Sequence, residues 1–168
     1  MQDDMIRELS TVDRDRMHRV WELAKSGNLN MLNAEEKRLG EVMLEHEDQY
    51  AKQFEMADIL RDHRFDPEFE EDPFLHIALH TIVENQLEAK DPIEAYQFFN
   101  AMRKKKVSRH DAIHLIAAML APLIVSTLKQ NKFFDLEKYK SLLKKCKGKK
   151  PYKIFSLLDK DLDSLPHE

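Results

Sequence analysis

Glycine is rare in this sequence, with three residues in a chain of 168. No glycine-rich loop of the kind that cradles phosphates is present. The scarcity of glycine, a charged fraction of 35 % and apolar residues that recur near a period of 3.6 positions favour helices over sheets. The length suits one domain with its own core. The sequence therefore predicts an all-α, single-domain helical bundle of six or seven helices.

Cysteine and long apolar runs are equally scarce. A single cysteine, Cys146, excludes an internal disulfide framework, and no histidine neighbours it, which disfavours a thiol nucleophile. The longest apolar run, residues 112–125, contains His114 and is shorter than a membrane span. The acidic N-terminal residues lack the apolar core of a signal peptide. We therefore expect a soluble cytoplasmic protein that has no membrane association.

Positive charge gathers near one end, although the whole chain carries a net charge of −4. Residues 137–153 contain eight lysines and one acid, Glu137, so this segment carries +7 and the rest of the chain −11. Such a segment can touch nucleic acid or an acidic partner, but lysines also line the solvent face of ordinary helices. We prefer the ordinary interpretation, because the acidic remainder repels polyanions and the segment has no arginine to read base edges. No specific binding of nucleic acid is expected.

The most informative stretch begins at Asp72 and Pro73. Asp72 is a good N-cap, and Pro73 suits the first helical position because its missing N–H would have no partner there. His76, His80 and Glu84 follow at intervals of four, so they lie one above another on one face of the predicted helix. They flank its apolar face, where a second helix can meet them.

A second predicted helix repeats this spacing. His110 and His114 stand four apart, and His114 leads into a run that is apolar almost all round, which predicts a buried helix. Ser108 and Asp111 resemble a capping box, so we interpret Asp111 as a capping residue and not as a ligand. A buried histidine needs a polar partner. Paired histidines on two helices therefore suggest a metal site.

His46 is a further candidate ligand. It follows the apolar period of a predicted helix over about residues 34–60, which has a break near residues 47–48. Residues 61–72 come next and contain six acids and His63. Their spacing does not match a calcium-binding helix-loop-helix, so we interpret this segment as an exposed acidic loop.

Two interpretations of the histidines stay open. On a straight helix His76 and Glu84 are ~12 Å apart along the axis, so one ion cannot easily take both. It could take either of them with His80, together with the pair from the second helix. Imidazole with carboxylate suits a divalent transition metal such as zinc, iron or nickel. Alternatively, the side chains form a closed hydrogen-bonded network, because neutral imidazole both donates and accepts. The candidate metal ligands are His46, His76, His80, Glu84, His110 and His114.

Three short motifs also match a known pattern. They are Glu45-His46, then Pro73-Phe74-Leu75-His76 followed by His80, Glu84 and Gln86, and finally His110 with His114. On these motifs, residues 34–131 resemble a bacterial family of uncharacterised proteins, domain of unknown function 1841. The chain departs from the family pattern at Glu47, where proline is usual, and at Asp72, where asparagine is usual. The resemblance implies an all-α fold and no established activity.

These observations predict three regions. They are an N-terminal helix and connector (1–33), a helical core that resembles the family (34–131), and lysine-rich C-terminal helices that pack on that core (132–168). The leading hypothesis is a bundle protein that binds a divalent transition metal through paired histidines. Glu84 is then either a ligand or a general base for a metal-activated water, which leaves open whether the protein is an enzyme. The alternative is a non-enzymatic interaction or regulatory module whose histidines form a buried polar network. An unknown protein partner or a homo-oligomer fits either hypothesis.

Overall fold

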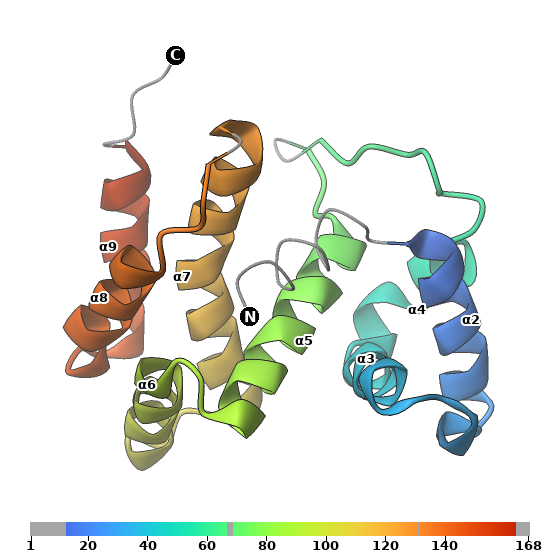
Figure 1. Ribbon diagram of the computed structural model, residues 1–168, viewed down its shortest axis with the longest axis horizontal. Coiled ribbons are helices and arrows are strands. Elements are labelled where there is room, and N and C mark those ends of the chain that lie inside the picture. Colours follow the sequence, from blue (N-terminus) through green and yellow to red (C-terminus); the bar gives the residue numbers. More distant parts are fainter. Residues whose placement is uncertain (1–12, 67–68, 131, 164–168) are drawn as a thin grey trace. The chain divides into compact units, whose positions relative to one another are not determined.

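The structure, a computed structural model, describes residues 13–66, 69–130 and 132–163, with side chains as far as residue 158. Within these ranges the chain forms eight α-helices and one short 3-10 helix, and no strand (Figure 1). The elements are α2 (Arg14–Lys25), η1 (Leu29–Met31), α3 (Ala34–Glu45), α4 (Glu47–Glu55), α5 (Pro73–Ala89), α6 (Ile93–Lys104), α7 (Arg109–Gln130), α8 (Leu136–Lys147) and α9 (Pro151–Asp163). The predicted all-α class is confirmed, with slightly more helices than expected.

The helices group into two compact units that divide between Thr81 and Ile82. Unit 1 contains α2, α3, α4 and the first part of α5, and unit 2 contains the rest of α5 together with α6 to α9. The division falls inside α5, which is one continuous helix. No linker therefore separates the two units, which fits the single-domain prediction.

Unit 1 is built on α2, which packs against α3 and α4. Asp13 caps α2, because its side chain accepts hydrogen bonds from the first free backbone amides of the helix. The buried stripe of α2 includes Val20 and Trp21. The ring of Trp21 lies 5.2 Å from the ring of Phe54 on α4, centroid to centroid. These residues belong to an apolar cluster that also contains Met43, close to the candidate ligand His46.

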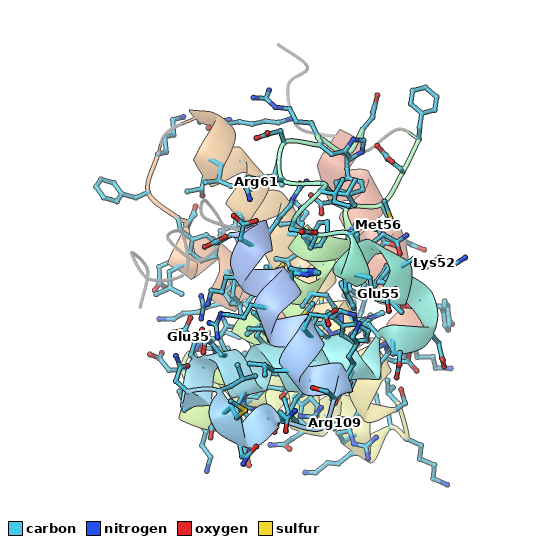
Figure 2. All side chains as sticks on the ribbon, turned by 90° about the vertical axis from the view of Figure 1, so that its right-hand side faces the viewer. Glu35, Lys52, Glu55, Met56, Arg61 and Arg109 are labelled. Atoms are coloured by element: carbon cyan, nitrogen blue, oxygen red, sulfur yellow. The ribbon has the colours of Figure 1, made fainter. Side chains whose placement is uncertain are left out.

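Exposed ion pairs surround α2, which faces the viewer in Figure 2. They join Arg16 to Glu35 at 2.8 Å, Lys25 to Glu55 at 3.5 Å and Arg61 to Asp15 at 2.7 Å. Exposed pairs of this kind contribute between about 0 and 1 kcal/mol each. The apolar cluster is therefore the main stabilising element of unit 1.

The predicted helix over residues 34–60 is two helices, α3 and α4, which meet at His46. The expected break thus falls one residue early and lands on the candidate ligand. His46 has φ −111° and ψ 15°, and it closes α3 and opens α4. The second helix also ends earlier than expected, at Glu55, and residues 56–62 form turns.

In unit 2, α7 packs against α6, α8 and α9. The capping prediction at its start is confirmed, since the Ser108 hydroxyl accepts a hydrogen bond from the Asp111 amide at 3.0 Å. The apolar run at residues 112–125 is short, but α7 has 22 residues and by length and composition alone could cross a membrane. Half of the tested window is buried inside the structure, and core helices of soluble proteins pass the same test.

Candidate metal centre

His46 is held at the junction of α3 and α4 with its side chain in the core. The residue is 1 % exposed. Its Nδ1 atom lies 2.8 Å from the carbonyl oxygen of Val42, one turn earlier in α3. A carbonyl oxygen only accepts hydrogen bonds, so this contact places the ring proton on Nδ1. The Nε2 lone pair of neutral His46 is then directed away from α3.

His76 and His80 project from the first half of α5. Asp72 caps this helix as predicted, and its carboxylate accepts hydrogen bonds from the amides of Phe74 and Leu75 at 2.9 and 3.1 Å. The two imidazole rings are stacked, with their centroids 4.7 Å apart. His80 is 2 % exposed, whereas the side chain of His76 is 17 % exposed.

Unit 1 brings these three histidines together. The Nε2 atoms of His46 and His76 lie 3.2 Å apart. The ring of His80 meets the ring of His46 edge-on at 4.5 Å, and each of these two residues offers a ring nitrogen within 4.8 Å of the other. Helix spacing brought His76 and His80 onto one face, and the break at His46 turns a third imidazole toward them.

A carboxylate and a phenol extend the cluster. Glu71 lies just before α5, and its Oε1 atom is 2.8 Å from His76 Nδ1. The Tyr50 hydroxyl donates a hydrogen bond to the other oxygen, Oε2, at 2.6 Å. Burial raises the pKa of Tyr50 well above its ordinary value, and the hydrogen bond and charge of Glu71 raise it further. Tyr50 is therefore a neutral hydrogen-bond donor at physiological pH.

These contacts decide where the ring protons lie. If Glu71 is ionised, it accepts a hydrogen bond from His76 Nδ1, just as the Val42 carbonyl accepts one from His46 Nδ1. Both Nε2 atoms then present lone pairs to each other at 3.2 Å. With Glu71 ionised, the two facing lone pairs repel, and this protonation state calls for a shared cation, which is either a proton or a metal ion. With Glu71 protonated, His76 instead donates its Nε2–H directly to His46 Nε2.

Unit 2 holds the other predicted ligands. His110 and His114 are half-buried, their ring centroids are 4.3 Å apart, and each offers a ring nitrogen within 4.8 Å of the other. Glu84 on α5 is 5 % exposed and forms an ion pair with Arg109, whose Nη2 atom lies 2.6 Å from Oε2. Arg109 therefore occupies the Oε2 atom of this carboxylate.

Sequence analysis missed three of the residues around these histidines, namely Tyr50, Glu71 and Arg109. Tyr50 follows the apolar period of its helix, so its sequence position suggests only packing. Glu71 stands in a run of acids that we interpreted as an exposed loop. It is indeed exposed, but it also contacts Tyr50 and His76. Arg109 offered one signal, since it directly precedes the first histidine of its pair.

Comparison with known proteins gives a family. A model described as a domain of unknown function, DUF1841, matches residues 11–145. The chain belongs to the DUF1841 family. The match extends beyond residues 34–131 in both directions, so the family region takes in α2 and most of α8. No curated protein and no solved structure matches the chain significantly. The DUF1841 description names no activity, so function has to be argued from the histidines themselves.

Proposed function

We propose that the protein binds a divalent transition metal ion (zinc, iron or nickel) through its paired histidines. The observation that carries this proposal is the 3.2 Å separation of the His46 and His76 Nε2 atoms. Two nitrogens bound to one tetrahedral zinc at ~2.0–2.1 Å are themselves ~3.3 Å apart. The separation of these two nitrogens therefore matches that of two ligands on such an ion.

The outer contacts of the two rings support the same proposal. Histidine ligands usually donate their second ring N–H to a carboxylate or a backbone carbonyl, which fixes the ring and leaves the other nitrogen for the metal. His46 has the carbonyl of Val42 in this role, and His76 has the carboxylate of Glu71. Both kinds of outer partner are thus found beside two rings whose Nε2 atoms face each other.

In unit 1 the proposed ligands are His46, His76 and His80. In unit 2 the candidate pair is His110 and His114. Glu84 is the remaining candidate, as a ligand or a general base, and its Oε2 atom already forms the ion pair with Arg109. A bound ion would supply Lewis acidity. The proposal includes no particular reaction. It does include a cytoplasmic location.

One observation favours the alternative, a non-enzymatic module with a buried polar network. The hydrogen bonds run in series from Tyr50 through Glu71 and His76 to His46. A single additional proton on His76 would satisfy every contact in this series without a metal, because imidazolium donates from both nitrogens. The two functions therefore differ in the cation that the histidines share.

Metal analysis of protein purified without a histidine tag distinguishes these functions. We expect near-stoichiometric zinc, iron or nickel, or uptake to that level when the chelated protein is titrated. Less than a tenth of an equivalent, with no uptake on titration, would reject metal binding and leave the polar network.

Paired substitutions then locate the ligands. We expect His46→Gln/His80→Gln to abolish uptake, while the matched control His63→Gln leaves it unchanged, because His63 is exposed and contacts Glu70. His110→Gln/His114→Gln tests the second pair. Full loss of uptake would mean that its ligands are needed for the same ion, and loss of half would mean two separate ions. Undiminished uptake in both double variants would contradict the proposal.

A further inference from the structure

Glu71 binds its two neighbours with two different oxygens. Oε1 lies 2.8 Å from His76 Nδ1, and Oε2 accepts the Tyr50 hydroxyl at 2.6 Å. Contacts this short to a carboxylate are typical of charge-assisted hydrogen bonds, which are stronger than neutral ones. Glu71 belongs to no helix, and its side chain contacts both His76 and Tyr50. Tyr50, in contrast, is anchored in the apolar cluster of unit 1.

Tyr50 is suited to hold this carboxylate. Its ring packs 5.4 Å from the ring of His76 and 6.1 Å from the ring of Phe54, so its hydroxyl has a defined position. Burial raises the pKa of the Tyr50 phenol, and the hydrogen bond and charge of Glu71 raise it further, so the proton stays on the phenol oxygen. Tyr50 therefore donates to Glu71 without competing with His76 for the same oxygen.

Access to the three histidines of unit 1 is unequal. His46 and His80 are 1 % and 2 % exposed, while the side chains of His76 and Glu71 are 17 % and 62 % exposed. The outer partner of His46 is a backbone carbonyl of its own helix, which cannot leave. The outer partner of His76 is an exposed side chain on a non-helical segment. Solvent therefore reaches this cluster on the side of His76.

We infer that Glu71, held by the Tyr50 hydroxyl, positions His76 and makes it the ligand through which the metal ion exchanges with solvent. This inference rests on the proposed metal-binding function. Glu71 is a positioning residue, because it contacts the ligand and acts through it. The exposed carboxylate also gives an incoming cation its first favourable contact beside the cluster. The metal is thus expected to be exchangeable and not permanently enclosed.

Substitutions at Glu71, measured in the full-length untagged protein, test this inference. Affinity for Zn²⁺ is measured by competition with a chromophoric chelator, and release by the rate of transfer to EDTA. Loss of an outer partner typically weakens metal binding 10–100-fold, so we expect a loss of about that size in Glu71→Ala with a faster release. Glu71→Gln keeps an acceptor for His76 and should lose less than Glu71→Ala. Tyr50→Phe should also lose less, since it only frees the carboxylate.

Controls separate positioning from folding. Glu70→Ala removes a neighbouring acid that contacts His63 and not His76, and it should leave affinity and release unchanged. Metal-free variants should keep the helix content of the wild type and a single cooperative melting transition, and Glu71→Ala should alter the visible absorption of bound Co²⁺. Two results would overturn this inference alone. In the first, the wild type takes up the metal and Glu71→Ala binds it with an affinity within twofold of the wild type. In the second, Glu70→Ala loses as much affinity as Glu71→Ala. Absence of uptake by the wild type would overturn the proposed function as well.

Discussion

Gly40 lies inside α3, where glycine is normally unfavourable by about 1 kcal/mol relative to alanine. Its position against α2 explains it. A Cβ atom there would lie 3.3 Å from both Val20 Cγ1 and Ala24 Cβ, and 2.9 Å from Leu29 Cδ2. The missing side chain lets α3 approach α2 closely, and this packing supports the end of α3 that presents His46.

The first prediction follows from this close approach. Gly40→Val should destabilise the protein by about 2 kcal/mol, because overpacking costs about 1–3 kcal/mol and exceeds the modest gain in helix propensity. Chemical denaturation with urea measures the change. The matched control is Gly148→Ala, where φ is −80° and a Cβ would meet nothing within 4 Å. That variant should be unchanged or more stable by about 0.4–1 kcal/mol. If Gly40→Val has the same free energy of unfolding as the wild type, the packing argument is wrong.

At the scale of single residues, the sequence predicted those side-chain positions that follow from the helical repeat. The interval of four placed His76 above His80, and the Asp72 cap set where their helix starts. Periodicity has no information about Glu71, which precedes the cap and resembles the other acids near it. Its contact with Tyr50 joins residues 21 positions apart, and only the folded chain brings them together.

Among the elements, α5 and α8 share a buried polar contact within unit 2. The Tyr139 hydroxyl donates a hydrogen bond to Gln86 Oε1 at 2.7 Å, and Tyr139 is fully buried. Burial raises the pKa of this phenol far above its ordinary value. The folded protein therefore strongly favours the neutral form of Tyr139.

The second prediction is a pH dependence at this contact. In the unfolded chain Tyr139 ionises near pH ~10, and in the folded protein it does so only at higher pH. Its stabilising contribution is thus complete below pH ~10 and is lost as the pH rises above that value. Tyr139→Phe should cost about 1–2 kcal/mol at pH 7, because Gln86 loses its donor. The difference from wild type should shrink by at most about 1.4 kcal/mol per pH unit above pH ~10.

Urea denaturation at several values between pH 7 and 11 measures this difference. The comparison of the two proteins at each pH removes the contributions of the lysines and of Tyr50, which titrate in both. A gap that stays constant or widens above pH ~10 would contradict the raised pKa of Tyr139.

Helix boundaries were predicted less well than helices. Asn33, Asp135 and Ser108 each bond to a backbone amide at the start of a helix, and such capping residues are visible in a sequence. The ends of α3 and α4 have no such marker. No glycine or proline stands between residues 41 and 66, and the apolar period continues past Glu55. Tertiary packing around His46 and Phe54 therefore sets these ends, which local sequence preference does not indicate.

For the whole molecule, the main electrostatic feature is the lysine-rich segment. In α8 the residues Tyr139, Leu143 and Cys146 are buried, and the lysines flank them on the helix. Two of these lysines have acidic partners, since Lys140 pairs with Glu137 at 3.2 Å and Lys144 with Glu94 at 3.3 Å. A further lysine, Lys105 after α6, donates to the carbonyl oxygens of Lys147 and Lys149. These contacts fit the interpretation of the segment as the solvent face of an amphipathic helix.

The last prediction is that this segment binds nucleic acid weakly and without regard to sequence. Residues 137–153 carry +7, but the rest of the chain carries −11 and repels the same polyanion. We expect no binding to duplex DNA tighter than about micromolar at physiological salt, which is the tighter edge of the non-specific range. Any binding should weaken with a log–log salt slope of about −0.9 per phosphate contacted, over roughly three to five contacts.

Fluorescence anisotropy with labelled duplexes of unrelated sequence tests this prediction across a salt series. The exposed lysines Lys138 and Lys145 provide the matched variant. Lys138→Glu/Lys145→Glu should reduce the salt slope by about 2, because each lysine that contacts a phosphate contributes about one unit. The substitutions leave the buried stripe of α8 intact, so stability should not change. A nanomolar complex that prefers one sequence would contradict the prediction and would favour an interaction module over a metal-binding protein.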